Sequence, residues 1–438
     1  MSKFFLRTFG CRCNQADSAA IRSSLCRQSM SETDSCREAE LIVVNSCTVT
    51  GRTDQQVRQA LRKFHRENPA ARLVVTGCYA ERDPQALAGL EGVSLVLGTG
   101  HKDRLVDLVR QPTGGPSVDV RRGPLDPERA LRLGDTAAIG SRTRPLVKVQ
   151  DGCDARCSYC IVPSVRGPGR SAPPEEILRA VRELVGLGFQ EIVLTGVNLG
   201  TYGRGLKEGV SLPALLRAVV QVPGLGRVRL SSIEPMRFDR EIIAIAGDSP
   251  ALARHFHIPL QSGSDRVLRL MRRPYRAERF LELLHFIDSR LPGVALGSDV
   301  LVGFPGETED DFAATLRLIE QAPLAYLHVF PFSARPGTDA AGMGDPVEPR
   351  AVRERVSILR GLSGSKNLAF RRRFLGRTLT AISLAREEQM GSSVVLTDNY
   401  IHARVPGPPV MPNRLVDVRI LQALPGTTNA ELQGGQTS

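Results

Sequence analysis

Apolar and β-branched residues gather in short runs near the start of the chain, and longer stretches of helical composition separate them. The runs predict strands at Lys3–Phe9, Glu40–Val44, Arg72–Val75 and Leu95–Leu97. Helices are expected at Ser18–Gln28, Thr53–Glu67 and Lys102–Arg110. Strands that alternate with helices favour a parallel sheet. Residues 1–112 are therefore predicted to form an α/β domain with an open parallel sheet.

The same alternation returns at larger scale after a segment rich in Gly, Pro and Arg, residues 113–140, which is predicted to be a linker. Residues 141–372 contain six predicted strands: Leu146–Val149, Glu191–Thr195, Arg227–Ser231, His255–Ile258, Ala295–Val302 and Ala325–Phe330. The helical stretches between them are Pro174–Leu187, Leu212–Val220, Asp239–Ala246, Ala277–Ser289 and Glu309–Glu320. This pattern fits a partial (β/α)6 barrel, with a doubly wound open sheet as the alternative. A charged stretch, Arg350–Leu375, reads as an exit helix.

The pattern changes again over residues 373–438, where helical stretches disappear. Short β-rich runs at Thr378–Ala385, Ser393–Leu396, Ile401–Val405 and Leu415–Leu421 are separated by Gly, Pro and Asn. Short strands with turn residues between them are typical of a small antiparallel β-barrel. The chain is thus predicted to contain three domains.

Composition narrows the class of protein. The 438 residues are 42% hydrophobic and 24% charged, as in ordinary folded domains. No apolar run is long enough to predict a membrane helix, so we expect no membrane partner and a cytoplasmic location. The net charge of +12 suggests a polyanionic partner. Positive charge is densest in the last domain and its approach, Arg371–Arg373, where we expect nucleic acid to bind.

Nine cysteines are present, and three of them, Cys153, Cys157 and Cys160, form a C-x₃-C-x₂-C motif after the first predicted barrel strand. Three thiolates on one loop can bind three irons of a [4Fe-4S] cluster. No cysteine follows Cys160, so one iron would remain open to a chelating ligand. A structural zinc site, the alternative, expects four ligands.

A second set of cysteines is dispersed. Cys11, Cys47 and Cys78 each follow a predicted parallel strand directly. Because the carboxyl ends of such strands line one crevice, we expect these thiols to converge on a second iron–sulfur cluster. Burial in the core is the alternative for cysteines beside strands. Cys26 and Cys36 are predicted to be small core residues, and Cys13 a bystander beside Cys11.

Several motifs together resemble the radical S-adenosylmethionine methylthiotransferases. They are Gly10–Gln15 (GCRCNQ), Asn45–Thr50 (NSCTVT), Thr76–Cys78 (TGC) and the C-x₃-C-x₂-C loop. The resemblance covers nearly the whole chain. It implies a flavodoxin-like N-terminal domain with an auxiliary cluster, a radical SAM partial barrel, and a C-terminal TRAM domain that binds RNA. Cys13 departs from the family, which usually has an apolar residue there.

One branch of that family matches best. Asn45–Thr50, Val149–Pro163, Leu194–Gly203 and Leu230–Pro235 look most like enzymes that modify N6-threonylcarbamoyladenosine at position 37 of tRNA. The alternatives are the branches that act on isopentenyladenosine in tRNA or on an aspartate of a ribosomal protein. A more distant alternative is a metal-stabilised RNA-binding module without catalysis.

The resemblance also implies a mechanism and partners. Cys153, Cys157 and Cys160 would hold a [4Fe-4S] cluster that binds S-adenosylmethionine and generates a radical able to remove hydrogen from C2 of the adenine. A second [4Fe-4S] cluster on Cys11, Cys47 and Cys78 would be the site of sulfur attachment. A tRNA is the expected substrate, and flavodoxin or ferredoxin is the expected type of electron donor.

Polar and glycine residues after the barrel strands are candidates for cofactor contacts. They are Gly196, Asn198, Ser231, Glu234, Gln261 and Ser262. Active sites of such barrels lie at the carboxyl ends of the strands, although turn or capping roles are the alternative. His255 and His257 are predicted to be strand residues rather than metal ligands.

Overall fold

A computed structural model describes residues 2–111, 118–123, 131, 133, 143–385 and 391–434. Its N-terminal sheet has six parallel strands in the order β2-β1-β3-β4-β5-β6. These strands are β1 (Lys3–Thr8), β2 (Ser31–Glu32), β3 (Leu41–Ser46), β4 (Arg72–Gly77), β5 (Val93–Leu97) and β6 (Asp119–Arg121). The expected linker lies mostly outside the described residues, and the part that is described supplies β6.

Helices cover both faces of this sheet. On one face, α1 (Arg12–Arg27) and α5 (Leu105–Arg110) pack through residues such as Leu25 and Leu105 against Val43 and Val74. On the other, α2 (Gly51–Glu67) packs against alternate residues of the same strands, including Val44. Short helices α3 (Cys78–Arg82) and α4 (Pro84–Ala88) follow β4. Alternate strand residues point to opposite faces, which explains why β3 begins with four apolar residues and β4 has three in a row at its centre.

The central domain forms a partial barrel whose parallel strands follow chain order. Its strands are β7 (Leu146–Lys148), β10 (Glu191–Thr195), β11 (Arg227–Leu230), β12 (His255–His257), β13 (Ala295–Val302) and β14 (Tyr326–Pro331). They pair as β11-β10-β7 and β12-β13-β14, and a Val228–Leu252 bridge joins the two halves. The outer helices are α7 (Pro174–Gly186), α8 (Leu212–Val219), α9 (Glu241–Asp248), α11 (Ala277–Arg290) and α12 (Glu309–Gln321). The predicted barrel is confirmed, with most boundaries within two residues.

Short helices and a two-stranded ribbon follow some of the barrel strands. A ribbon of β8 (Gln150–Asp151) and β9 (Arg170–Ser171) flanks α6 (Val162–Arg166), and α10 (Asp265–Leu270) follows the fourth strand. Helix α13 (Pro349–Arg372) leads out of the barrel, as expected. None of the helices in the described part of the chain is both long and apolar enough to cross a membrane.

The C-terminal domain is a closed barrel of five strands in the order β15-β16-β17-β19-β18. The strands are β15 (Thr378–Ser383), β16 (Ser392–Thr397), β17 (His402–Pro406), β18 (Leu415–Leu424) and β19 (Thr427–Leu432). All neighbours pair antiparallel except β17 and β19. The prediction of a small β-barrel is confirmed, and β19 is a strand that the sequence pattern did not reveal.

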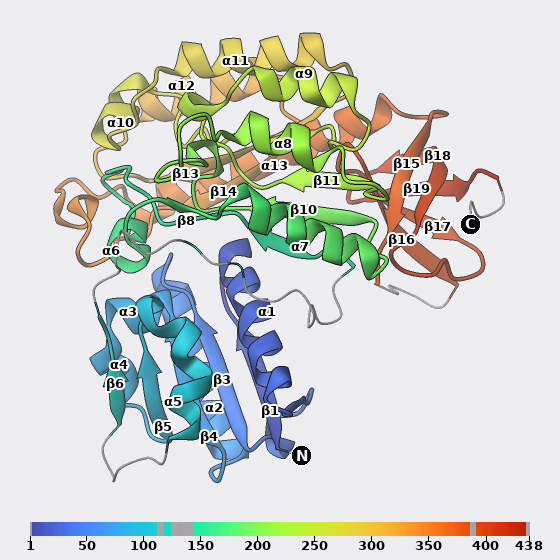
Figure 1. The fold of residues 1–438 in the computed structure, drawn as a ribbon. Helices are drawn as coiled ribbons and strands as arrows, with labels where there is room; N and C mark the ends of the chain where they lie inside the picture. Colours follow the sequence, from blue (N-terminus) through green and yellow to red (C-terminus); the bar gives the residue numbers. More distant parts are fainter. Residues whose placement is uncertain are drawn as a thin grey trace.

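The three domains meet closely (Figure 1). Helix α1 of the N-terminal domain lies beside β7 of the central barrel, with Lys148 bound to Asp17. Arg335, which follows β14, is buried against Asp54 and Thr48 of the N-terminal domain. The fully buried Arg229 of β11 donates to the carbonyl oxygens of Thr397 and Asp398 in the C-terminal barrel, at 3.0 Å each.

Candidate functional site

The three cysteines of the C-x₃-C-x₂-C motif lie on the loop between β8 and α6. Backbone hydrogen bonds hold the loop: the Cys153 amide donates to the carbonyl of Gly167, just after α6, at 3.0 Å, and the Cys160 amide donates to the Cys157 carbonyl at 3.1 Å. Gly152 has a φ of +75°, and a Cβ there would lie 1.9 Å from the Pro168 carbonyl oxygen. Only glycine fits this turn. Burial raises the pKa of Cys160 to about 12, with Cys157, Cys153 and Glu234 adding to the effect.

Two polar side chains contact these thiols. Asn198 Nδ2 lies 3.7 Å from Cys153 Sγ, and the backbone amide of Asn198 donates to Gln150 Oε1 at 2.8 Å. Asn198 Oδ1 is buried and has no partner within the described part of the chain. Arg273 Nη1 lies 3.5 Å from Cys157 Sγ, and the same buried guanidinium pairs with Glu234. Arg273 therefore places a positive charge beside the thiols, where it offsets the charge of thiolates.

The other residues expected near the cofactor divide into two groups. The Gly196 amide donates to Ser231 Oγ at 3.3 Å, so both residues lie beside the Asn198 turn. Ser262, in contrast, is directed toward α12, with its Oγ 3.4 Å from Thr315 Oγ1. Gln261 has a left-handed φ of +70°, and its amide donates to the Asp299 carbonyl. The structure therefore gathers Gly196, Ser231, Asn198 and Glu234 around the loop and assigns Ser262 to a helix contact.

The loop suits an iron–sulfur cluster by its donor set. Thiolates are the ligands that such clusters take, and only three are available on the loop. The unpartnered Asn198 oxygen beside them offers an acceptor to a group held at the remaining position. These residues fit a [4Fe-4S] cluster with one iron left for S-adenosylmethionine.

The dispersed cysteines are brought together at one edge of the N-terminal sheet. Cys11 caps α1 after β1, Cys47 follows β3, and Cys78 begins α3 after β4. These three strands are adjacent in the sheet. Burial raises the pKa of Cys47 to about 12, and the neighbouring Cys78 and Cys11 thiols contribute. The expected convergence of three thiols is thus present in the structure.

Glycine makes this convergence possible. Gly10 has a φ of +99°, and a Cβ there would lie 2.4 Å from Cys47 Cβ and 2.6 Å from Cys47 Sγ. Gly77, with a φ of +101°, approaches the Ser46 carbonyl oxygen so closely that a Cβ would lie 2.3 Å away. Both glycines therefore allow neighbouring strand ends to meet around the thiols.

The remaining cysteines differ from one another. The Cys13 thiol donates to Cys11, and this hydrogen bond is the main cause that lowers the pKa of Cys11 to about 5. Cys36 is buried, as predicted, with its Sγ 3.2 Å from a Glu67 oxygen. Cys26 is exposed on α1, so the prediction of a core role was wrong. Helical spacing had not distinguished the solvent face of α1 from its packed face.

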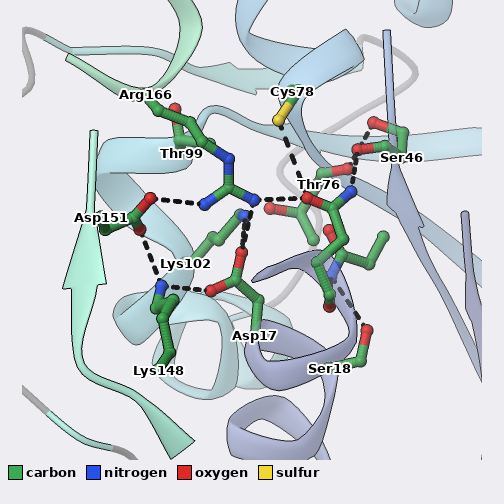
Figure 2. A network of polar contacts seen from close by, with 12 residues as sticks. Asp17, Ser18, Ser46, Thr76, Cys78, Thr99, Lys102, Lys148, Asp151 and Arg166 are labelled. Carbon is green, nitrogen blue, oxygen red and sulfur yellow. Dashed lines mark hydrogen bonds and ion pairs between the residues drawn. The ribbon is translucent and has the colours of Figure 1, made fainter. Parts of the chain in front are cut away.

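A buried network of charges extends from the neighbourhood of Cys78 to Asp151, just before the loop cysteines in the chain (Figure 2). Arg166 of α6 donates to Asp151 at 2.7 Å and to Asp17 at 3.0 Å, and it also donates to Asn14. Lys102 and Lys148 contact Asp17 as well, and Lys148 contacts Asp151. Three cations therefore face two carboxylates in this network. The uncompensated positive charge lies near the thiols of Cys11 and Cys78, where it favours bound anionic groups.

The two sets of thiols also pack through shared apolar contacts. Cys78 forms one cluster with Ile161 and Val165, which directly follow the loop cysteines. Asn14 Oδ1, an acceptor for Arg166, lies 3.8 Å from Cys78 Sγ. The N-terminal triad thus contacts the segment that continues from Cys160.

Sequence reasoning missed the cations around both triads. No motif or spacing in the sequence marks Arg166 and Arg273, because arginine is abundant along this chain. Their burial becomes visible only in the folded structure. The three-residue stretch Arg371–Arg373, expected to meet nucleic acid, also needs correction. Arg371 is buried and donates to the carbonyl oxygens of Thr427 and Leu424, whereas Arg372 and Arg373 are exposed.

The histidines of the barrel interior belong to strands, as expected. His257 Nε2 lies 2.8 Å from Asp299 Oδ1, and His328 Nδ1 lies 3.3 Å from the same oxygen. His255 Nε2 lies 2.8 Å from Tyr326 Oη. The ring nitrogens of His257 and His328 and the Asp299 oxygen lie within 4.8 Å of one another, and they share hydrogen bonds.

Known proteins resemble this chain in both sequence and fold. Residues 147–319 match the Radical SAM superfamily, and residues 3–98 match Uncharacterized protein family UPF0004. Among solved structures, the radical S-adenosylmethionine methyltransferase TsrM from Kitasatospora setae superposes with a TM-score of 0.57 at 15% identity, covering 78% of this chain and 75% of that one. This likeness supports the fold alone.

Relatives of known name match over almost the full length. The threonylcarbamoyladenosine tRNA methylthiotransferase MtaB of Bacillus subtilis is 36% identical over 97% of this chain and 94% of its own. The tRNA-2-methylthio-N(6)-dimethylallyladenosine synthase of Geobacter metallireducens is 34% identical over 98% of each chain.

Proposed function

Since the chain belongs to the family of radical S-adenosylmethionine tRNA methylthiotransferases, we propose that it transfers a methylthio group to C2 of N6-threonylcarbamoyladenosine at position 37 of tRNA. The MtaB relative carries this nucleoside in its name. The observation that carries the proposal is the pair of cysteine triads, together with the packing of Cys78 against Ile161 and Val165, which lie just after Cys160 in the chain.

Each triad would hold one [4Fe-4S] cluster: Cys153, Cys157 and Cys160 in the barrel, and Cys11, Cys47 and Cys78 in the N-terminal domain. When bound, the barrel cluster with S-adenosylmethionine supplies one-electron cleavage of the sulfonium and a radical that removes hydrogen. The C2 hydrogen of adenine is not acidic, which is why ordinary acid–base catalysis does not serve this reaction. The auxiliary cluster would provide the site where sulfur is attached.

The protein's own residues prepare this chemistry in three ways. Asn198 offers a buried oxygen acceptor beside the loop, and Gly196 leaves room next to Gln150, where a Cβ would lie 3.0 Å from two side-chain atoms. Arg273 and Arg166 supply positive charge beside the thiols. The partial barrel encloses the loop and so limits side reactions of the radical.

The expected partners follow from the same proposal. The exposed arginines Arg372 and Arg373 lead into the C-terminal barrel, which we take to be the TRAM domain and a contact for the tRNA backbone. A low-potential donor such as flavodoxin or ferredoxin would supply electrons. The cytoplasm is the compartment that provides these partners.

Mass spectrometry of tRNA nucleosides tests the substrate. We expect a strain that lacks this gene to accumulate threonylcarbamoyladenosine and to lose its 2-methylthio derivative, with recovery when the gene is restored. Loss of 2-methylthio-isopentenyladenosine instead would show that the other tRNA branch is correct. Unchanged tRNA with an altered ribosomal protein mass would support the ribosomal alternative.

A further inference from the structure

The floor of the central barrel holds a stack of rings from the central and C-terminal domains, and an arginine of the N-terminal domain contacts that stack. His255 of β12 stacks on Tyr400 of the C-terminal barrel, with ring centroids 4.1 Å apart and planes inclined by 16°. Tyr326 of β14 stacks on Tyr400 at 5.7 Å. Arg12, the first residue of α1, places its Nη2 3.5 Å from Tyr400 Oη. Arg12 therefore reaches the interior of the barrel from the N-terminal domain.

The arginines at this junction differ in how their charge is balanced. Arg144, Arg227 and Arg229 all lie within 3.4 Å of Glu191 and share its negative charge. Arg12 is half-buried, and no carboxylate in the described part of the chain pairs with it. Burial, together with the charges of Arg229, His257 and Arg12, lowers the pKa of His255. Among the described residues, Arg12 thus brings to the junction a positive charge that no carboxylate pairs with, while Glu191 pairs the other arginines and Asp299 bonds His257.

A second unused polar atom lies in the same ring stack. His255 is 1% exposed, and its Nδ1 has no hydrogen-bond partner among the residues that the structure describes. Buried polar atoms are nearly always paired in proteins. The ring nitrogen without a partner, and the Arg12 guanidinium that bonds Tyr400 but no carboxylate, indicate a place for a polar, anionic ligand.

The chemistry of the nucleoside places such a ligand here. In adenine, C2 and the carbon that carries N6 are both bonded to N1, so a group on N6 lies along the edge that receives the sulfur. Whatever recognises that group must therefore lie next to the sulfur site. Arg12 directly follows Cys11 in the chain, and Cys11 belongs to the auxiliary triad.

We propose that Arg12 is a specificity-determining residue that binds the carboxylate of the threonylcarbamoyl group. This inference rests on the proposed function. A guanidinium binds a carboxylate through two parallel hydrogen bonds. An isopentenyl group has no charge and would leave the guanidinium unpaired, which selects against it.

Two anticodon stem-loop RNAs test this assignment with the reconstituted holoenzyme. One carries threonylcarbamoyladenosine, and the other carries the same nucleoside with the carboxylate converted to a primary amide. We expect the wild type to prefer the first by roughly 10- to 100-fold in Kd and kcat/KM, as for a hydrogen bond to a charged group. Arg12→Gln should bind both RNAs equally, at the level of the amide. Arg12→Lys should restore part of the preference, because lysine keeps the positive charge but cannot form the two parallel hydrogen bonds of a guanidinium.

Arg22→Gln is the matched control, because Arg22 lies on the same helix but pairs with Glu32 at the surface. It should keep the wild-type preference. Equal binding of the two RNAs by the wild type, or an undiminished preference in Arg12→Gln, would overturn the inference. Methylthiolation of an isopentenyladenosine RNA in preference to both would instead overturn the proposed function. Iron analysis of each variant accompanies the Kd measurements, and only preparations with the wild-type iron content are compared.

Discussion

The two cysteine triads reach similar arrangements by different routes. Cys153, Cys157 and Cys160 lie on one loop. Backbone hydrogen bonds near the loop, and Ser158 bonded to the Leu270–Met271 segment, hold it in place. Cys11 and Cys47, with Cys78, come from three strand ends and meet only because the sheet aligns those strands. The first triad therefore depends mainly on one segment of the chain, whereas the second depends on the arrangement of the whole N-terminal sheet. Perturbing the sheet should therefore affect one triad and leave the other.

Cysteine substitutions test this contrast with the largest expected effects. Cys157→Ala should abolish both S-adenosylmethionine cleavage and tRNA modification, because the loop loses a ligand. Cys47→Ala should abolish modification but retain cleavage. Each variant should contain about four irons instead of about eight after reconstitution. Iron analysis and 5′-deoxyadenosine assays measure both effects, and loss of cleavage in Cys47→Ala would show that the triads depend on each other.

Replacing Arg166 tests the link between the triads. Arg166→Met leaves Asp17 and Asp151 without their shared guanidinium, and losing a buried hydrogen bond to a charged group costs about 1.5–3 kcal/mol. We expect a lower thermal midpoint and earlier separation of the N-terminal domain in limited proteolysis. Arg204→Met is the control, because Arg204 pairs with Asp154 at the surface. An unchanged midpoint in Arg166→Met would contradict a stabilising role.

The same network predicts how stability depends on pH. Neighbouring cations, acting against burial, hold the pKa of Asp17 well below its usual range, with Lys102 the strongest of them. A carboxylate with a lowered pKa stabilises the folded state above its unfolded pKa, about 4, and this contribution is lost as the pH falls. Thermal midpoints of the wild type should therefore fall steeply below about pH 4. Asp17→Asn should be less stable at pH 7 and should show a shallower fall.

Glycine substitutions separate the triads with smaller effects. Gly10→Ala should reduce assembly of the auxiliary cluster, because its Cβ would overlap Cys47. Gly152→Ala should reduce assembly of the barrel cluster in the same way. Gly188→Ala is the control, since Gly188 has a φ of +89° but no atom within 4 Å of an added Cβ. The control should show only backbone strain of about 1 kcal/mol, with both clusters retained. Equal cluster loss in all three variants would argue against specific steric overlap.

Residues after the barrel strands should show the smallest effects, and these effects should be unequal. Asn198→Ala should raise the KM for S-adenosylmethionine several-fold, because it removes the unpartnered oxygen beside Cys153. Ser262→Ala should change that KM by less than twofold and lower stability by about 1 kcal/mol, because Ser262 contacts Thr315. Steady-state kinetics with S-adenosylmethionine as the varied substrate would measure the difference. A raised KM in Ser262→Ala would contradict the observed direction of its side chain.

Much of the fold could be predicted because the buried strands are strongly apolar. Strands β10 and β13 agree with their predicted limits to the residue. Strand β19, with the sequence TTNAEL, was missed because few of its residues are apolar. The two-residue β2 is too short to show any alternation.

The candidate site was predictable only where a strand end or a fixed spacing marks it. The expectation that barrel active sites lie at the carboxyl ends of the strands identified both Asn198 and Ser262 as candidates. It does not say which way a side chain points. Arg273 and Arg166 were missed because a count of charges does not reveal burial. Arg371 shows the opposite error, since its charge was counted toward nucleic-acid binding although the fold buries it.

The closed C-terminal barrel has a consequence for how this enzyme can be divided. Arg229 is bonded to the carbonyl oxygens of Thr397 and Asp398, and Tyr400 stacks on His255 within the central barrel. Cutting the chain after α13 would uncover Arg229 and remove one wall of the junction that contains Arg12. The C-terminal domain therefore closes one end of the central barrel and cannot be exchanged alone. A chimera must exchange the contacting residues of both domains together.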